Sequence, residues 1–258
     1  MIGILYILVI ILANSVGAVS GMGGGVIIKP VLDFIGFHSI AEISFYSTVA
    51  VLTMSVVSTS KQIKNGISVN WTSAGQLSVG SVIGGVIGTT AFNALLKQFP
   101  DGMVVQLTQI ILTLLTLLFA YWYSRGERRR YNYQSGIIKI ATGFLLGFLA
   151  SLLGIGGGPI NVALLMLLFN LPIKAATVYS IIIILFSQAA KVITIFLSKK
   201  WIGIDMTMLW YIIPAAIVGG YLGALISKKV SNQRVNQIYQ VVILLVMALN
   251  IYNAWRLF

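Results

Sequence analysis

The chain has 258 residues, of which 58% are hydrophobic and only 9% charged, with a mean hydropathy of +0.97; this excludes a soluble protein, in which about 25% of residues are charged. The net charge of +12 comes from basic residues in short clusters between apolar runs, which favours topology signals in an integral membrane protein over a nucleic-acid partner. One histidine, no cysteine and no G-x-x-x-x-G-K-[ST] phosphate loop argue against an enzyme, so we predict no cofactor, no metal and no catalytic residue.

Ten apolar segments follow one another between polar breaks. No Lys or Arg precedes the first segment, as it would in a signal peptide, so we expect this segment to stay as a membrane helix. A basic linker, 124–136, separates five segments from the next five and is expected in the cytoplasm. The expected segments are 1–19, 26–37, 40–60, 72–96 and 103–123, and then 137–153, 159–170, 174–198, 205–227 and 235–257.

The two halves, about 1–123 and 137–258, share short sequence motifs in the same order. We therefore predict that residues 1–258 form a single membrane transport domain of two homologous halves, each with one segment too short to cross a bilayer of about 30 Å alone. The matching motifs are Gly21-Met22-Gly23-Gly24-Gly25 with Gly154-Ile155-Gly156-Gly157-Gly158, Tyr46-Ser47 with Tyr179-Ser180, and Gly84-Gly85-x-x-Gly88 with Gly219-Gly220-x-x-Gly223.

The short segments allow two topologies. If they cross, with the glycine stretches broken open inside the membrane, each half has five crossings and the halves are inverted. If they dip in and return on the same side, each half has four crossings and the halves are parallel. The first arrangement places ten Lys and Arg residues inside against four outside, and the second places nine against five. Because positive charge collects in the cytoplasm, we favour inverted repeats.

The paired glycine stretches are predicted to break their helices, because each glycine costs about 1 kcal/mol against alanine in a helix interior. A break inside a bilayer leaves N–H groups that need partners, and the positive end of a helix dipole favours an anion. A tight bend with no ligand is the alternative. The Gly84 and Gly219 motifs are expected instead to let helices pack closely. The glycines predicted to bind an anion are Gly23, Gly24, Gly25, Gly156, Gly157 and Gly158.

Polar residues within the apolar runs are further candidates for substrate binding, because a bilayer penalises them unless they line a bundle interior or a cavity. Gln188 and Lys191 share one helix face, although a lysine can also extend to the membrane surface. A separate group, His38 and Glu42 with Asp33, is a candidate for proton coupling, with a solvated loop as the alternative. The remaining candidate ligands are Lys29, Ser47, Asn161 and Ser180, and Asn14 and Ser20 border the first glycine stretch.

The sequence resembles the TauE/SafE sulfite exporter family. The likeness rests on a Gly-x-Gly-Gly-Gly stretch that opens a short apolar segment once in each half, with a serine roughly twenty residues later, and it extends over essentially the whole chain. It implies a bacterial inner-membrane permease for sulfite, sulfonates such as sulfoacetate, or other sulfur-containing anions. The family's Gly-Thr-Ser pattern is replaced here by Phe45-Tyr46-Ser47 and Val178-Tyr179-Ser180, which leaves the role of the two serines open.

We therefore predict a secondary transporter of a small sulfur-containing anion, with a multi-pass chain in the bacterial cell membrane and the lipid bilayer around it. Alternating access would expose the glycine-rich broken-helix ends, and the anion bound to them, to each side in turn. A passive anion channel and a structural membrane protein that transports nothing are the alternatives, and a homodimer is one assembly that we consider.

Overall fold

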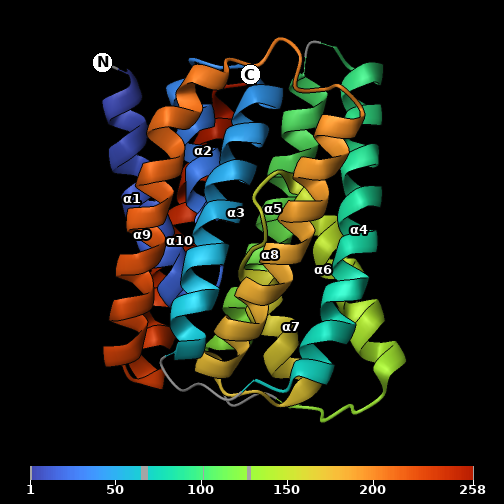
Figure 1. Ribbon diagram of the computed structural model, residues 1–258, viewed down its shortest axis with the longest axis vertical. Helices are drawn as coiled ribbons and strands as arrows, with labels where there is room; N and C mark the ends of the chain where they lie inside the picture. Colours follow the sequence, from blue (N-terminus) through green and yellow to red (C-terminus); the bar gives the residue numbers. More distant parts are fainter. Residues whose placement is uncertain (1, 65–68, 101, 127–128, 258) are drawn as a thin grey trace.

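The structure is a computed structural model that describes residues 2–64, 69–100, 102–126 and 129–257. These residues form ten α-helices and one short 3₁₀ helix, η1, with no strand (Figure 1). The helices are α1 (Ile2–Ser20), α2 (Gly25–Ile35), α3 (Ile40–Lys64), α4 (Trp71–Gln98), α5 (Met103–Ser124), α6 (Gly136–Leu153), α7 (Pro159–Phe169), α8 (Ile173–Leu197), η1 (Met206–Met208), α9 (Leu209–Lys229) and α10 (Asn232–Trp255).

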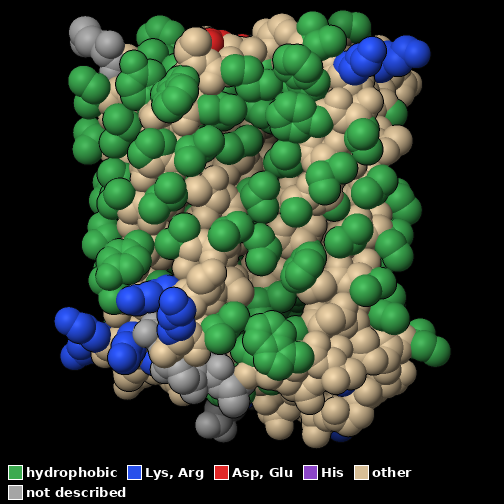
Figure 2. All heavy atoms as spheres, viewed as in Figure 1, with side chains coloured by type: hydrophobic (Ala, Val, Ile, Leu, Met, Phe, Trp, Pro, Cys, Tyr) green, Lys and Arg blue, Asp and Glu red, His purple; other side chains and the backbone are tan. Residues whose placement is uncertain are grey.

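Eight spans in the described part of the chain are long and apolar enough to cross a membrane. They are α1, α3, α4, α5, α6, α8, α10 and the span Met206–Lys229, which combines η1 with α9. The helices α2 and α7 have 11 residues each and are too short to do so alone. Hydrophobic side chains cover most of the face seen in Figure 2, whereas Lys and Arg gather near its two ends. The prediction of an all-α, multi-pass membrane protein is confirmed.

The two short helices return to the end of the bundle from which the preceding helix started. The Tyr6 hydroxyl, near the start of α1, lies 2.7 Å from His38 Nδ1, just after α2. Similarly, the Tyr131 N–H, before α6, donates to the carbonyl of Leu167 near the end of α7. Both chain termini lie at one end of the bundle, and the described linker residues 129–135 lie at the other (Figure 1). Successive helices thus run in alternating directions, and each half begins at one end of the bundle and finishes at the other, as expected for five segments in each half. The duplication of the halves stays a prediction.

The two Gly-Gly-x-x-Gly motifs lie where helices pack closely, as predicted. A β-carbon on Gly84 or Gly88 would overlap the backbone carbonyl of Phe144 or Phe148 in α6. In α9, Gly219 and Gly223 lie against α1, and Gly220 lies against α3. The missing side chains thus bring backbones into contact, as in small-residue packing of membrane helices. Helix α4 of the first half thereby packs on α6 of the second, and α9 of the second packs on α1 of the first.

We expect Gly84→Val to destabilise the protein, because the added side chain pushes α4 away from α6. The free energy of unfolding should fall by about 1–3 kcal/mol or more, seen as a lower melting temperature of the detergent-solubilised protein. Gly75→Val is the matched control, because Gly75 lies in the same helix with no atom within 4 Å of its β-carbon position. Equal melting temperatures for the two variants would contradict this account of the packing.

Candidate functional site

The two glycine stretches meet each other inside the bundle. A β-carbon on Gly25 would overlap the carbonyl oxygen of Ile155, and one on Gly23 would lie 3.4 Å from the carbonyl oxygen of Gly156. Val51 of α3 and Ile184 of α8 contact both stretches, and each lies near the middle of its helix. The predicted break in each half is therefore observed, and the two breaks form one contact at mid-depth in the bundle.

The turns use conformations that favour glycine. The φ angles of Gly21 and Gly23 are +73° and +74°, and those of the matching Gly154 and Gly156 are +69° and +68°. A residue with a β-carbon is strained in this region. The third position differs between the stretches, because Gly24 is right-handed helical with φ −66°, whereas Gly157 has φ +118°. The two stretches thus share a turn but present different backbone groups after it.

Five of the six predicted anion-binding glycines have N–H groups that donate to no backbone carbonyl among the described residues. The exception is Gly156, whose N–H donates to the carbonyl of Ala150. Gly24 and Gly158 precede the first residues of α2 and α7, where the helix dipole is positive. Pro159 occupies the first position of α7, which suits a residue without an N–H. The stretches therefore offer unused donors in a buried place.

Lys191 lies fully inside the protein beside this contact, with 1% of its surface exposed. Its ammonium group donates to Ser44 Oγ at 2.9 Å and to the carbonyl of Ser151 at 3.2 Å. Ser44 Oγ in turn lies 2.7 Å from the β-carbon position of Gly154. The ion pairs found among the described residues leave Lys191 without a carboxylate. The alternative of extension to the membrane surface does not hold for Lys191.

A cavity of about 280 Å³ connects Lys191 with the end of the bundle where both termini lie. Two more cations, Lys97 at the end of α4 and Lys200 after α8, line it together with Asn93. No acidic side chain is among its lining residues in the described part of the chain. A cleft lined by one sign of charge raises the local concentration of the opposite ion, so this cavity is suited to admitting anions.

Lys29 approaches the same turn but already has a partner. Its Nζ lies 2.7 Å from Asp33 Oδ2, and the two side chains are only 4% and 5% exposed. Its Cε lies 3.4 Å from the β-carbon position of Gly154. In the sequence Lys29 follows the first glycine stretch by one helical turn, whereas its side chain reaches Gly154 of the second stretch. Asp33, which the sequence grouped with His38 and Glu42, pairs with this lysine.

Several candidate side chains carry buried polar atoms without a hydrogen-bond partner among the described residues. Both amide atoms of Asn161 are in this state, as are Gln188 Oε1 and Ser47 Oγ. Asn161 Nδ2 lies 3.3 Å from the β-carbon position of Gly157, and Ser47 Oγ lies 2.9 Å from that of Gly25. Buried polar groups normally have partners, so these atoms are unused hydrogen-bonding groups, and those of Asn161 and Ser47 lie beside the glycines.

Other candidates have structural partners instead. The Ser180 hydroxyl donates to the carbonyl of Gly21 at 2.5 Å and so joins α8 to the first stretch. Asn14 Nδ2 donates to the carbonyl of Ala50, while its Oδ1 has no partner among the described residues. The hydroxyl of Ser20 donates back to the carbonyl of Val16.

His38 and Glu42 form their hydrogen bonds with different partners. His38 contacts the hydroxyl of Tyr6 and packs edge-on against the Tyr46 ring, with 5.2 Å between ring centroids. Glu42 accepts hydrogen bonds from the N–H and hydroxyl of Ser39, in the capping box that starts α3. These contacts favour structural roles at the end of the bundle.

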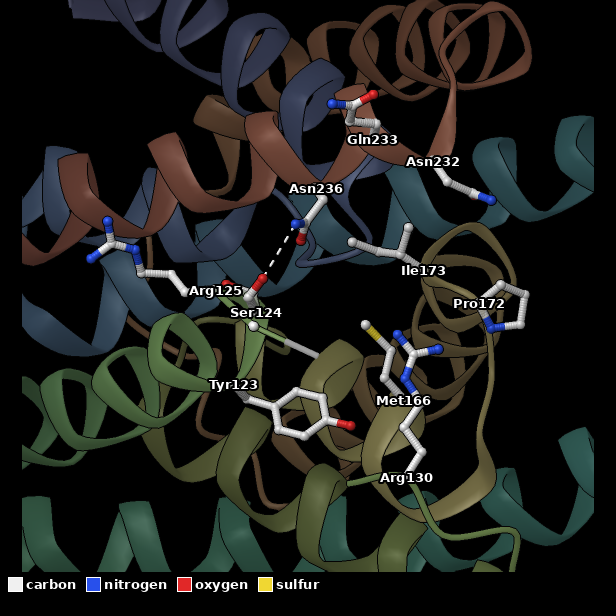
Figure 3. Close-up of a pocket in the computed structure, with 11 residues that line it drawn as sticks. Tyr123, Ser124, Arg125, Arg130, Met166, Pro172, Ile173, Asn232, Gln233 and Asn236 are labelled. Atoms are coloured by element: carbon white, nitrogen blue, oxygen red, sulfur yellow. Dashed lines mark hydrogen bonds between the residues drawn. The ribbon is translucent and has the colours of Figure 1, made fainter. Parts of the chain in front are cut away.

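A second cavity, of about 490 Å³, lies at the linker end of the bundle (Figure 3). The Arg130 side chain points into it beside Met166 and Tyr123, whereas Arg125 extends away. Asn236 Nδ2 donates to the carbonyl of Ser124 on its wall. None of the predicted ligands lines this cavity, so it does not belong to the site around Gly154.

Sequence reasoning missed five contributors to the site: Ser44, Asn93, Lys97, Ser151 and Lys200. Ser44 lies one helical turn before Ser47, a spacing that places both on one face of α3 and was readable in the sequence. The two exposed lysines carry no local signal, because they join Lys191 only through the packing of α4 on α8.

The fold is that of a polytopic membrane protein with a buried break in two of its helices and a lysine-lined cavity beside that break. The family described as "Sulfite exporter TauE/SafE" matches residues 6–251, and the chain belongs to this family. A relative from Bacillus subtilis (strain 168), named "Probable membrane transporter protein YunE", is 27% identical over 263 residues, which cover 94% of this chain and 95% of the relative. No solved structure matches the chain. The predicted family is confirmed, and the protein is a membrane transporter and not an enzyme.

We expect a cysteine placed in the lysine-lined cavity to react with a small anionic thiol reagent, because Lys97 and Lys200 attract anions there. The chain has no native cysteine, so Asn93→Cys gives a single reactive site for methanethiosulfonate ethylsulfonate. Adding Lys200→Gln should slow this labelling several-fold without slowing a cationic reagent of the same size. Ile83→Cys, on the exposed apolar face of the same helix, is the control and should stay unlabelled. Equal labelling of Asn93→Cys and Ile83→Cys would contradict the claim that the cavity is accessible to anions.

Proposed function

We propose that the protein is a secondary transporter of a small sulfur-containing anion, such as sulfite or an organosulfonate, in the bacterial cell membrane. The observation that carries the proposal is the buried ammonium group of Lys191, which has no carboxylate partner among the described residues and lies at the inner end of a lysine-lined cavity. An unpaired buried charge costs several kcal/mol, and intramembrane charges typically mark substrate pathways. A bound anion would offset that cost.

The bound anion would lie beside the Gly154 turn. Lys191 and Ser44 approach this turn from one side and Lys29 from another. The N–H groups of Gly157 and Gly158 and the amide of Asn161 would complete the coordination, since they lack partners in the described structure. Sulfite and sulfonate groups carry three oxygens that accept hydrogen bonds, which suits a site with several converging donors.

Alternating access is supported by the way the two helical hairpins enter the bundle from opposite ends. The pair α1 and α2 begins at the end with the termini, the pair α6 and α7 begins at the linker end, and their glycine turns touch. In transporters with inverted repeats, one repeat rocks against the other around a site near the midplane. A cytoplasmic linker, as its arginines suggest, places the lysine-lined cavity on the outer side of the membrane.

We expect Lys191→Met to lower anion counterflow in proteoliposomes by about tenfold or more, because it removes the buried positive charge while keeping a long side chain. Labelled sulfite is exchanged against trapped sulfite, sulfoacetate, isethionate, sulfate or chloride, and the sulfur anions other than sulfate should compete best. Lys228→Met, an exposed lysine at the far end of α9, is the matched control. Full exchange by Lys191→Met would rule out the proposed site, and ion conductance without counterflow would favour a channel.

A further inference from the structure

Lys139 is another buried lysine, in the first turn of α6, which starts at the linker end of the bundle (Figure 1). Only 9% of its surface is exposed, and its Nζ donates to Ser73 Oγ of α4 at 3.0 Å. No described carboxylate forms an ion pair with it. A lysine has three N–H donors, and a buried charge is costly unless it is paired and hydrogen-bonded. The ammonium group therefore has unused capacity for an anion.

A cavity of about 220 Å³ lies beside this ammonium group, between α4, α6, α8 and the linker. Its lining contains no acidic side chain in the described part of the chain. The volume of one water molecule in the liquid is about 30 Å³, so the cavity has room for a small oxyanion with part of its hydration shell. Besides Lys139, the polar lining residues are Asn70, Ser73, Asn132, Tyr133, Gln134 and Tyr179.

The corresponding place at the opposite end of the bundle is filled by aromatic rings. The shift of 133 positions between the matching glycines pairs Lys139 with Tyr6. The same shift pairs Leu171, on the cavity wall, with His38. Tyr6 and His38 are joined by a hydrogen bond of 2.7 Å, and both rings pack edge-on against Tyr46. The linker end thus has a lysine and a cavity where the other end has packed rings.

One contact is the same in both places. The N–H of Asn70, just before α4, donates to the hydroxyl of Tyr179 at 2.7 Å. At the other end, the Tyr46 hydroxyl donates to the carbonyl of Asp205, just before η1, at 2.9 Å. Each tyrosine thus ties its own helix, α8 or α3, to the start of the next helix of the other half. The surrounding helices are therefore held alike at both ends, and the cavity arises from the side chains between them.

We propose that the cavity around Lys139 is a second anion site, which binds an oxyanion group of the phosphate or sulfonate kind. The oxyanion lies against the ammonium group, and Ser73, whose oxygen accepts a hydrogen bond from that group, donates its own hydroxyl proton to the anion. Several convergent donors suit an oxyanion, which has several acceptor atoms, better than a halide. No residue lines both this cavity and the one beside Lys191, so the two sites are separate. The proposal does not depend on which anion the protein transports.

The test uses a cysteine in the cavity wall, because the chain has no native cysteine. Leu171→Cys places a thiol there without removing a polar group. Methyl methanethiosulfonate labels the thiol, and since this reagent is uncharged, only occupancy of the cavity slows it. In the purified full-length protein at constant ionic strength, inorganic phosphate should slow labelling and the effect should saturate. Adding Lys139→Met should raise the half-protecting phosphate concentration about tenfold or more, and adding Ser73→Ala should raise it several-fold.

Two controls separate this site from general effects of charge and from the site at Lys191. Lys228→Met, which removes an exposed lysine at the end of α9, should leave the protection of Leu171→Cys unchanged. Asn93→Cys reports on the other cavity, and its labelling should not respond to Lys139→Met.

A comparison of two membranes identifies the source of the oxyanion. Protection by phosphate in phosphatidylcholine nanodiscs indicates a free ion, whereas protection in phosphatidylglycerol nanodiscs without phosphate indicates a lipid headgroup. Either protection should require Lys139.

Three results would overturn the proposal: no protection by phosphate or by phosphatidylglycerol, protection that persists undiminished in Lys139→Met, or a thiol at Leu171→Cys that the reagent does not reach. If Lys139→Met does not fold, Ser73→Ala serves in its place, because it keeps the lysine and removes only the hydroxyl. These measurements do not involve counterflow, so their failure is distinguishable from failure of the proposed transport function.

Discussion

The structure depends on how two interrupted helices are accommodated where water is absent. Backbone groups exposed in a bilayer are costly, and irregular backbone is tolerated there only inside protein or beside a cavity. Here each glycine stretch is packed against the other, so that Gly25 faces the carbonyl of Ile155 and Gly23 faces that of Gly156. Neither turn would be buried in this way without its partner. This mutual contact therefore fixes the positions of α2 and α7, and it places the unused N–H groups at one point in the bundle.

Glycine has a second use that supports the first. In α4 and α9 it is part of regular helices, and its missing side chain lets Gly84 contact α6 and Gly219 contact α1. Those contacts join helices from different halves of the sequence and hold α1 and α6, whose ends carry the broken turns. Helix-packing glycines thus provide a rigid frame, whereas the left-handed glycines at Gly23 and Gly156 provide the change of direction. Glycine serves both the close helix contacts and the turns, because these two uses differ only in the backbone conformation of the glycine.

The helices were largely predictable because each is bounded by a local signal. The expected segment 159–170 is observed as Pro159–Phe169, and 26–37 as Gly25–Ile35, since glycine and proline end helices by their own backbone chemistry. Helix α3 continues beyond the expected residue 60 to Lys64, because polar residues extend a helix past the apolar core. The site was less predictable. Lys29, Lys191 and Asn161 stand out as polar residues in apolar runs, but the pairing of Lys29 with Asp33 required knowing that α2 is buried on that face.

The site is strongly unequal on its two sides, and this inequality bears on how transport proceeds. Lys29, Ser44 and Lys191 all lie towards the end with the termini; in the sequence alignment of the halves, Lys29, Ser44 and Lys191 match Val162, Thr177 and Ser58, which are uncharged. Thr177 contacts Gly21 as Ser44 contacts Gly154, so the turns have similar neighbours but different charge. An anion carried as proposed would therefore pass from a cationic surface to a neutral one as it crosses between the turns. The weaker binding there would favour its release near the linker, where the Arg130 side chain points into a cavity.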